Sequence, residues 1–340
     1  MAKFLAICLS STIQKTISFE RVELKHVNRS THYRLDASGK AINSARILEQ
    51  LKSQSENDCT VHSICPLGSK NAKLFLDLAK QDNLSVSFVK IPGFTRECCT
   101  VLDKSNKTTT ELVVGEPNPS RKDLLKIKKT EEKLIKKIFG QIKKSDFVLL
   151  AGSRPDFWKS DLYPIICENA VKNKKTILAD FWGKDLLATL EKTTPSIIKI
   201  NDEEYCKTFD LDFPCDSETL KNHISKKSEE LKNIIIITRG TDSTLAADCG
   251  KLYECATEKI DDVVNTTACG DSFNAGFLQE YAKSKNIEAA LKKGTWAAAR
   301  NAEKECPGTV LWWKRSRIFR FAQYPRMSVS GTLESLHYPK

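Results

Sequence analysis

The sequence predicts an α/β protein of three layers, in which a mainly parallel sheet lies between two layers of helices. Short runs rich in Val, Ile and Leu alternate with segments of helical periodicity along most of the chain. Several of these runs are continuously apolar, as is typical of strands buried on both faces. The 340 residues, 40% of them hydrophobic, suffice for one large domain with a small addition.

Seven apolar runs are predicted to form the main sheet. They cover residues 4–9, 61–65, 86–91, 147–151, 176–181, 197–200 and 234–238. Between them, apolar residues at helical spacing predict helices over 41–51 and 121–144. This alternation of strand and helix is typical of a parallel sheet covered on both faces.

Two segments break the alternation and predict a second, smaller sheet. Residues 15–36 and 95–115 alternate polar and apolar side chains, with no helix between their runs. Hairpin-like insertions of this kind can pair with each other beside the main sheet and act as a lid. We therefore expect one domain over 1–310 with these lid segments inserted.

Residues 311–340 form a basic tail. From Trp312 onward there are six basic residues and one acidic residue. Such a tail could contact RNA or an anionic surface. Its composition is equally that of a disordered extension, which is the interpretation we favour.

Composition and charge exclude several classes of protein. No apolar run approaches the roughly 20 residues that a membrane span requires, so we expect no membrane partner. The twelve cysteines include no Cys-x-x-Cys pair, and most lie in apolar or small-residue stretches, as reduced thiols of the cytoplasm do. The segment 121–144 carries ten Lys and Arg residues with a single aromatic residue, Phe139, among them, which favours a solvated helix face over nucleic-acid binding.

The segment Asn265-Thr-Thr-Ala-Cys-Gly-Asp-Ser-Phe is the strongest candidate for a catalytic motif. Small residues in a turn that opens a helix present consecutive backbone N–H groups to an anion such as phosphate. Asp271 lies in the first turn of that predicted helix, where its carboxylate is stabilised and can accept a proton from a hydroxyl. Taken by itself, the pattern also fits an ordinary helix start.

Together with other motifs, this segment resembles the PfkB, or ribokinase-like, family of carbohydrate kinases. The family pattern Asp/Asn-Thr/Ser-x-Gly-Ala-Gly-Asp corresponds to residues 265–271. In family order, the further matches are Gly39, Lys40 and Asn43; Thr95 and Arg96; residues 151–155, including Ser153; Lys199, Asn201 and Glu204; and Thr238 and Gly240. The resemblance implies a ribokinase-like three-layer fold with a β-sheet lid, and often a homodimer that pairs through the lid.

The resemblance also implies the parts of a phosphoryl-transfer site. Asp271 would be the base, and the backbone of Ala268, Cys269 and Gly270 the anion hole for the γ-phosphoryl group. Lys199, Thr238 and Gly240 would line the ATP site, and Asn201 and Glu204 would organise Mg²⁺, largely through water.

On the substrate side, the pattern points to the phosphosugar branch of the family. Lys40 and Arg96 would hold the phosphate already on the sugar, and this pair makes a nucleoside substrate less favoured. The remaining contacts to the sugar would come from Gln14, Gly39, Asn43 and Ser153.

Several residues depart from the family pattern. Gln14 stands where the family has an aspartate that binds sugar hydroxyls, and Ser38 and Ala41 replace glycines. Ala268 and Cys269 add side chains at the anion hole. Two hypotheses follow: a kinase with an altered phosphosugar preference, which we favour, or a regulatory protein of the same fold that binds a sugar phosphate or nucleotide.

Overall fold

The chain folds as an alternation of strands and helices, which the computed structural model describes for residues 1–52, 59–116 and 119–311. The strands are β1 (Ala2–Ile7), β2 (Thr12–Phe19), β3 (Tyr33–Ser38), β4 (Cys59–Gly68), β5 (Val86–Ile91), β6 (Arg96–Asp103), β7 (Thr108–Val113), β8 (Phe147–Ala151), β9 (Thr176–Asp180), β10 (Ile197–Asn201), β11 (Ile234–Arg239), β12 (Asp242–Asp248) and β13 (Lys251–Cys255). The helices are α1 (Lys40–Lys52), α2 (Ala72–Gln81), α3 (Arg121–Ile142), α4 (Leu162–Lys172), α5 (Lys184–Leu190), α6 (Asp202–Phe209), α7 (Ser217–Leu231), α8 (Cys269–Ser284) and α9 (Ile287–Ala302).

The main sheet has the strand order β13-β12-β11-β10-β9-β8-β1-β4-β5 within the described residues. The strands from β11 to β5 in this order are parallel, and β12 and β13 add an antiparallel edge. The chain runs outward from β1 through β4 to β5, then returns to the other side of β1 at β8. Ligands of open α/β sheets bind at the carboxyl ends of the strands where the order reverses in this way.

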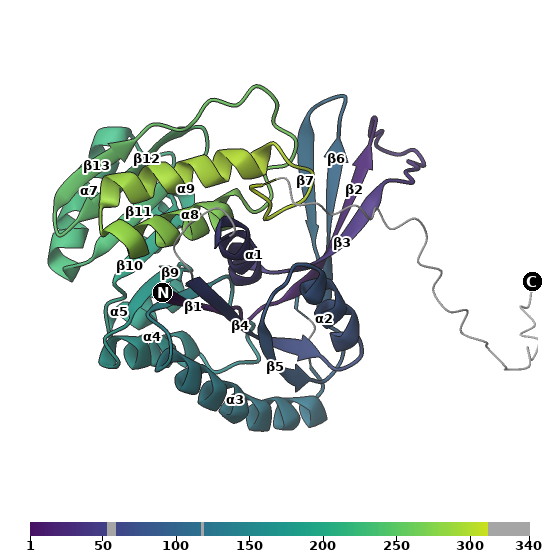
Figure 1. Cartoon of the computed structure of the whole chain (residues 1–340), viewed down its shortest axis with the longest axis horizontal. Helices are drawn as coiled ribbons and strands as arrows, with labels where there is room; N and C mark the ends of the chain where they lie inside the picture. Colours follow the sequence, from purple (N-terminus) through teal and green to yellow (C-terminus); the bar gives the residue numbers. More distant parts are fainter. Residues whose placement is uncertain (53–58, 117–118, 312–340) are drawn as a thin grey trace, which may run out of the picture.

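Helices cover both faces of this sheet, so that the protein has three layers (Figure 1). Alternate residues of β1 enter different cores: Phe4 and Ala6 pack with α1, α2, α8 and α9, whereas Leu5 and Ile7 pack with α3, α4, α6 and α7. Side chains on successive residues of a strand point to opposite faces, which explains the division. The predicted parallel α/β architecture is confirmed.

A second sheet has the order β3-β2-β6-β7 and projects beside the main sheet (Figure 1). The strands of each predicted insertion form a hairpin, β2 with β3 and β6 with β7, and the hairpins join through the parallel pair β2–β6. We call these four strands the lid sheet. The expectation of a small sheet built from two distant segments is therefore confirmed.

The predicted strand positions agree with the structure, with small shifts at the ends. The first strand begins and ends two residues earlier than predicted, and the second extends from Cys59 to Gly68. The edge hairpin β12–β13 was not predicted. The basic tail, apart from Leu311, lies outside the described residues.

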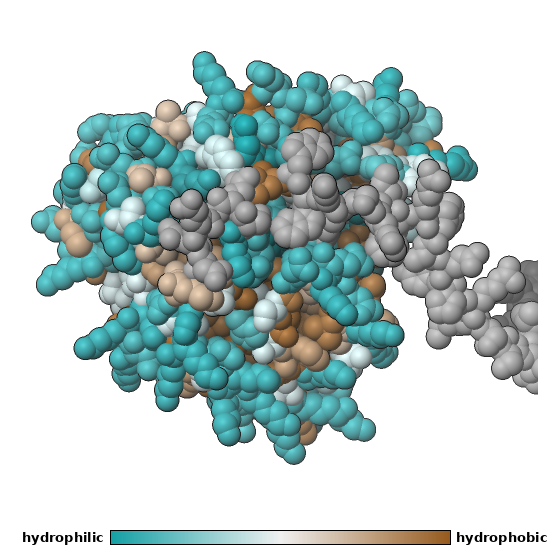
Figure 2. Space-filling model, in the orientation of Figure 1, coloured by the Kyte–Doolittle hydropathy of each residue, from teal (hydrophilic) through white to brown (hydrophobic). Residues whose placement is uncertain are grey.

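The surface is mostly hydrophilic on the face seen in Figure 2, with hydrophobic residues in small separate groups. None of the helices in the described part of the chain is long and apolar enough to cross a membrane. All twelve cysteines lie within the described ranges, and all are free thiols.

Candidate active site

The turn that begins α8 has the geometry that the motif predicts. Ala268, at the N-cap of the helix, has a left-handed backbone with φ of 66°. An L side chain costs roughly 1 kcal/mol or more in this region, and glycine avoids that cost. Asp271 follows in the first turn and is buried, with 6% of its surface exposed. The N-terminal amides of α8 and its helix dipole therefore lie beside this carboxylate.

The environment of Asp271 makes it a better proton acceptor than an ordinary carboxylate. The Asn43 Nδ2 donates a hydrogen bond of 2.8 Å to the Asp271 Oδ2. Burial, and secondarily the charge of Asp180, raise the pKa of Asp271 from 3.8 to about 6, against opposing effects of Asn43, Lys40 and Lys199. The group is thus mostly ionised at neutral pH, yet close to the pKa that suits a general base.

Asp180 is a site residue that sequence reasoning missed. It ends β9 and is almost fully buried, and it accepts hydrogen bonds from the Lys40 Nζ at 3.1 Å and the Asn274 Nδ2 at 2.6 Å. The Lys199 Nζ lies 3.7 Å from the Asp180 Oδ2, the oxygen that accepts from Asn274. Burial alone would raise the pKa of Asp180, but the charges of Lys199 and Lys40, together with the hydrogen bonds from Asn274 and Lys40, outweigh burial and lower the pKa to about 2. A carboxylate at the carboxyl end of an apolar parallel strand was the available signal.

Lys199 reaches the start of α8 from the middle of the sheet. A Cβ at Gly270 would lie 2.9 Å from the Lys199 Nζ, so glycine leaves room for the ammonium group at the anion-hole turn. Nearby, the Thr267 Oγ1 and the Asn274 Oδ1 are buried without a hydrogen-bond partner among the described residues. A cation, a helix N-terminus and polar atoms that lack partners together suit a bound anionic group with its own donors and acceptors.

Asn201 and Glu204 form a capping box at the start of α6. The Asn201 side chain accepts from the Glu204 N–H at 2.7 Å, and the Glu204 Oε2 accepts from the Asn201 N–H at 3.0 Å. The other Glu204 oxygen lies 3.7 Å from the Lys40 Nζ. The pair therefore has a structural role in the helix cap and also borders the Lys40–Asp180 group.

At two positions near the site, Gly39 and Gly152, the backbone conformation and the close neighbours explain why the residue is glycine. Gly39 has a φ of +124°, and a Cβ there would lie 2.6 Å from the Cys8 Sγ. Gly152 has a φ of +99° and lies beside Lys40, whose Cβ would be 3.7 Å from an added Cβ. Two strand ends and the start of α1 thus meet closely, which brings Lys40 to Asp180.

Two predicted sugar-binding side chains in the lid sheet are engaged within the protein. The Gln14 Nε2 donates to the Thr100 Oγ1 at 2.7 Å. The Arg96 Nε lies 3.3 Å from the Glu116 Oε1, and its Nη1 donates to the Val114 carbonyl. Because Lys40 pairs with Asp180 instead, the two predicted phosphate-binding cations have separate carboxylate partners.

The remaining predicted residues lie at the carboxyl ends of strands in the main sheet. Ser153 is exposed after β8, and Thr238 lies beside Asn201 in the β10–β11 register. Gly240 forms the turn between β11 and β12 with a φ of +58°. Arg154, the residue after Ser153, is buried and pairs with Asp185 at 2.9 Å.

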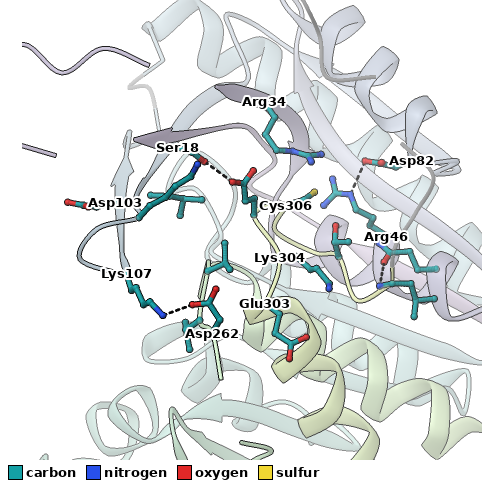
Figure 3. A pocket seen from close by; sticks show the side chains of 18 residues that line it. Ser18, Arg34, Arg46, Asp82, Asp103, Lys107, Asp262, Glu303, Lys304 and Cys306 are labelled. Carbon is teal, nitrogen blue, oxygen red and sulfur yellow. Dashed lines mark hydrogen bonds and ion pairs between the residues drawn. The ribbon is translucent and has the colours of Figure 1, made fainter. Parts of the chain in front are cut away.

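A cavity of about 730 Å³ lies elsewhere, between the lid sheet and the segment 303–306 (Figure 3). Lys107, in the turn between β6 and β7, pairs with Asp262 across it at 2.7 Å, and the Ser18 hydroxyl donates to Glu305 at 3.4 Å. Asp271 and Asp180 do not line this cavity, whereas Arg46, a neighbour of Asn43, does. The candidate active site is therefore the cluster around Asp271, and the cavity is separate from it.

The family described as pfkB family carbohydrate kinase matches residues 5–314. The chain belongs to this family and is a carbohydrate kinase, and membership implies ATP as its phosphoryl donor.

Known proteins similar to this chain include curated relatives and solved structures. A tagatose-6-phosphate kinase from Staphylococcus epidermidis is 25% identical over 319 residues, which cover 93% of this chain and 97% of the relative. Phosphofructokinase-2 from Escherichia coli has a similar structure with a TM-score of 0.76 at 16% identity, covering 89% of this chain and 94% of that one. A possible 1-phosphofructokinase from Thermotoga maritima gives 0.75 at 18% identity, covering 89% and 92%. At these identities the two structures show the fold alone.

Proposed function

We propose that the protein transfers the γ-phosphoryl group of ATP to a hydroxyl of a phosphosugar, converting a hexose monophosphate to a bisphosphate. The observation that carries this proposal is the buried Asp271, held by Asn43 at the positive end of α8 beside Lys199. The curated relative acts, by its name, on tagatose 6-phosphate. An activity like that of tagatose-6-phosphate kinase or 1-phosphofructokinase is therefore the substrate class to test.

Asp271 would accept the proton of the attacking hydroxyl. Its raised pKa, about 6, gives it more basicity than a solvated carboxylate while leaving it ionised at neutral pH. The hydroxyl oxygen then attacks the γ-phosphorus in line, the bond from phosphorus to the bridging oxygen breaks, and ADP leaves. The hydrogen bond from Asn43 would keep the carboxylate aimed at the acceptor.

Charge on the transferring group would be stabilised by the turn before Asp271. The backbone amides of Ala268, Cys269 and Gly270 are the proposed anion hole, and Lys199 would add its positive charge there. Asp180 would keep Lys199 and Lys40 in place, since it contacts both. Thr238 and Gly240 would border the nucleotide.

Mg²⁺ would lie at the acidic edge of this cluster, where the described residues offer two oxygen-bearing side chains rather than a closed set of three acidic ligands. The Glu204 carboxylate and the Asn201 amide are the oxygen-bearing groups that would organise the hydrated ion, mostly through water. When bound, Mg²⁺ neutralises phosphate charge during transfer. On the sugar side, Lys40 and Arg96 would bind the existing phosphate, with Gln14, Gly39, Asn43 and Ser153 as the contacts to the sugar.

The direct test measures ADP release from Mg-ATP with fructose 1-phosphate, fructose 6-phosphate and tagatose 6-phosphate. We expect turnover with at least one sugar, and its loss by several orders of magnitude in Asp271→Asn. Absence of turnover with every sugar, in a folded protein, would contradict the proposal.

A second candidate is a regulatory protein that binds a sugar phosphate or nucleotide without turnover. The contacts of Gln14 with Thr100 and of Arg96 with Glu116 support it, because both side chains are engaged within the protein. It predicts a ligand-induced rise in melting temperature without ADP release. Turnover abolished by Asp271→Asn would exclude it.

A further inference from the structure

Asn43 connects Asp271 to two further side chains. The Asn43 Nδ2 donates to the Asp271 Oδ2 at 2.8 Å. On its other side, the Asn43 Oδ1 accepts from the Ser38 Oγ at 2.9 Å and from the Arg46 Nη1 at 3.0 Å. All four side chains are buried. The amide is thus held between donors on one side and the carboxylate on the other.

Arg46 decides which way this amide faces. A guanidinium group only donates, so the Asn43 oxygen must face Arg46 and the NH₂ group must face Asp271. Arg46 is itself fixed: its Nε donates to Asp82 at 2.8 Å, its Nη1 also to the Pro307 carbonyl and its Nη2 to the Ala37 carbonyl. The Arg46–Asp82 pair is visible in Figure 3. A rotated amide would place NH₂ against this immobile cation.

Ser38 stands where the sequence motif has a glycine, and its hydroxyl supplies the second donor to Asn43. We propose that Arg46 and Ser38 are positioning residues that hold the Asn43 amide with its NH₂ on Asp271. The departure from the motif at position 38 then supports the base rather than obstructing the site. This inference rests on the proposed function, in which Asp271 acts on the substrate hydroxyl.

The pKa of Asp271 should respond to the orientation of the Asn43 amide. Charged and titratable groups face this carboxylate from every neighbouring element: Lys40 from α1, Asp180 from β9, Lys199 from β10, Cys8 after β1 and Cys269 from α8. The Asn43 hydrogen bond lowers the pKa of Asp271. Loosening the amide should therefore raise the pKa and leave less of the base ionised at neutral pH.

The experiment titrates Asp271 by ¹³C NMR of the protein labelled at its Asp carboxyl carbons, with the resonance identified by its absence in Asp271→Asn. We expect Ser38→Ala to raise the pKa of Asp271 by about half a pH unit, and Arg46→Met by about 1 unit. In an Asn43→Ala background, Ser38→Ala should shift the pKa no further. Equal shifts with and without Asn43, or no shift in a folded Ser38→Ala protein, would overturn the proposal.

A matched control is Ser63→Ala, which removes a buried hydroxyl without a hydrogen-bond partner in the described structure. It should leave the titration unchanged. In activity assays at pH 6, Ser38→Ala should lower kcat/KM about twofold, with the KM for ATP unchanged. If the wild type turns over none of the sugars, the proposed function fails, while the NMR titration still decides the role of Ser38. Should Arg46→Met not fold, Ser38→Ala alone carries the test.

Discussion

The Lys40 Nζ lies 3.1 Å from the Asp180 Oδ1, which joins the first residue of α1 to the last residue of β9. The same carboxylate contacts Lys199 through its other oxygen, 3.7 Å away. Asp180 is thus a shared counter-ion for two cations of the site. Attraction to Asp180 is the main reason that the pKa of Lys40 is raised, so this lysine stays charged. An anionic substrate would meet two lysines held in place before it arrives.

Replacing Asp180 should affect both stability and the base. Asp180→Asn removes the buried counter-ion of Lys40 and Lys199, so we expect a loss of about 3 kcal/mol in the free energy of unfolding. Because the charge of Asp180 raises the pKa of Asp271, the variant should also move the acidic limb of kcat/KM to lower pH. Urea unfolding and a pH–rate profile measure the two effects.

Asp185→Asn is the control for this experiment. It breaks the Arg154–Asp185 pair, which is also largely buried but involves neither Asp271 nor the lysines that Asp180 contacts. The control should lose stability without moving the acidic limb. An unchanged limb in Asp180→Asn would mean that Asp180 does not influence the base.

The pH dependence of the wild type follows from Asp271 itself. The base must be ionised, and its pKa is about 6 in the folded protein. We therefore expect kcat/KM for the sugar phosphate to fall below about pH 6, close to tenfold per unit once the pH is well below this value. Steady-state kinetics between pH 5 and 8 at saturating Mg-ATP would show it. A fall in kcat/KM only near pH 4 would instead indicate that Asp271 has the pKa of a solvent-exposed carboxylate.

The lid sheet carries exposed apolar residues that suit a homodimer. On its edge strand β7, Leu112 and Val113 are 55% and 62% exposed, and Val114 follows. We expect a dimer at micromolar concentration and a monomer for Val113→Lys, measured by light scattering. Leu187→Lys, at an exposed apolar position on α5, should leave the dimer intact. A monomeric wild type would contradict this prediction.

The parallel sheet and the lid could be predicted because their patterns are local. Continuous β-branched runs such as 234–238 are typical of strands buried on both faces, and alternation in 15–36 distinguishes the lid. The sequence pattern did not predict the β12–β13 hairpin, because this hairpin lies at the edge of the main sheet. There, residues such as Lys251 and Glu254 are exposed and interrupt the apolar pattern.

A motif names some residues of the candidate site, such as Asn43 and Asp271, and the structure brings these two within 2.8 Å of each other. The sequence does not predict a contact whose partner comes from a distant element. Asp180 reaches Lys40 across 140 positions of sequence, and Arg46 reaches Pro307 across 261. Arg154 follows β8 directly after Ser153, yet its side chain forms an internal ion pair with Asp185. Backbone position is encoded locally, whereas the direction of a side chain depends on the packed neighbours.

Keeping the buried Asp271 ionised costs the folded protein stability. The pKa of its carboxyl is 3.8 ordinarily and about 6 in the folded protein, so folding favours the protonated form. The stability from this group is complete below pH 3.8 and is lost as the pH rises through 6. At pH 8 the ionised, buried group costs at most about 3 kcal/mol. Asp271→Asn should therefore abolish turnover yet unfold at higher urea than the wild type at pH 8, with the difference shrinking toward pH 4. Asp271→Ala also leaves the Asn43 NH₂ group without its acceptor, so this variant should gain less stability than Asp271→Asn. An Asp271→Asn protein no more stable than the wild type at pH 8 would show that Lys40, Lys199 and Asn43 compensate this buried charge fully.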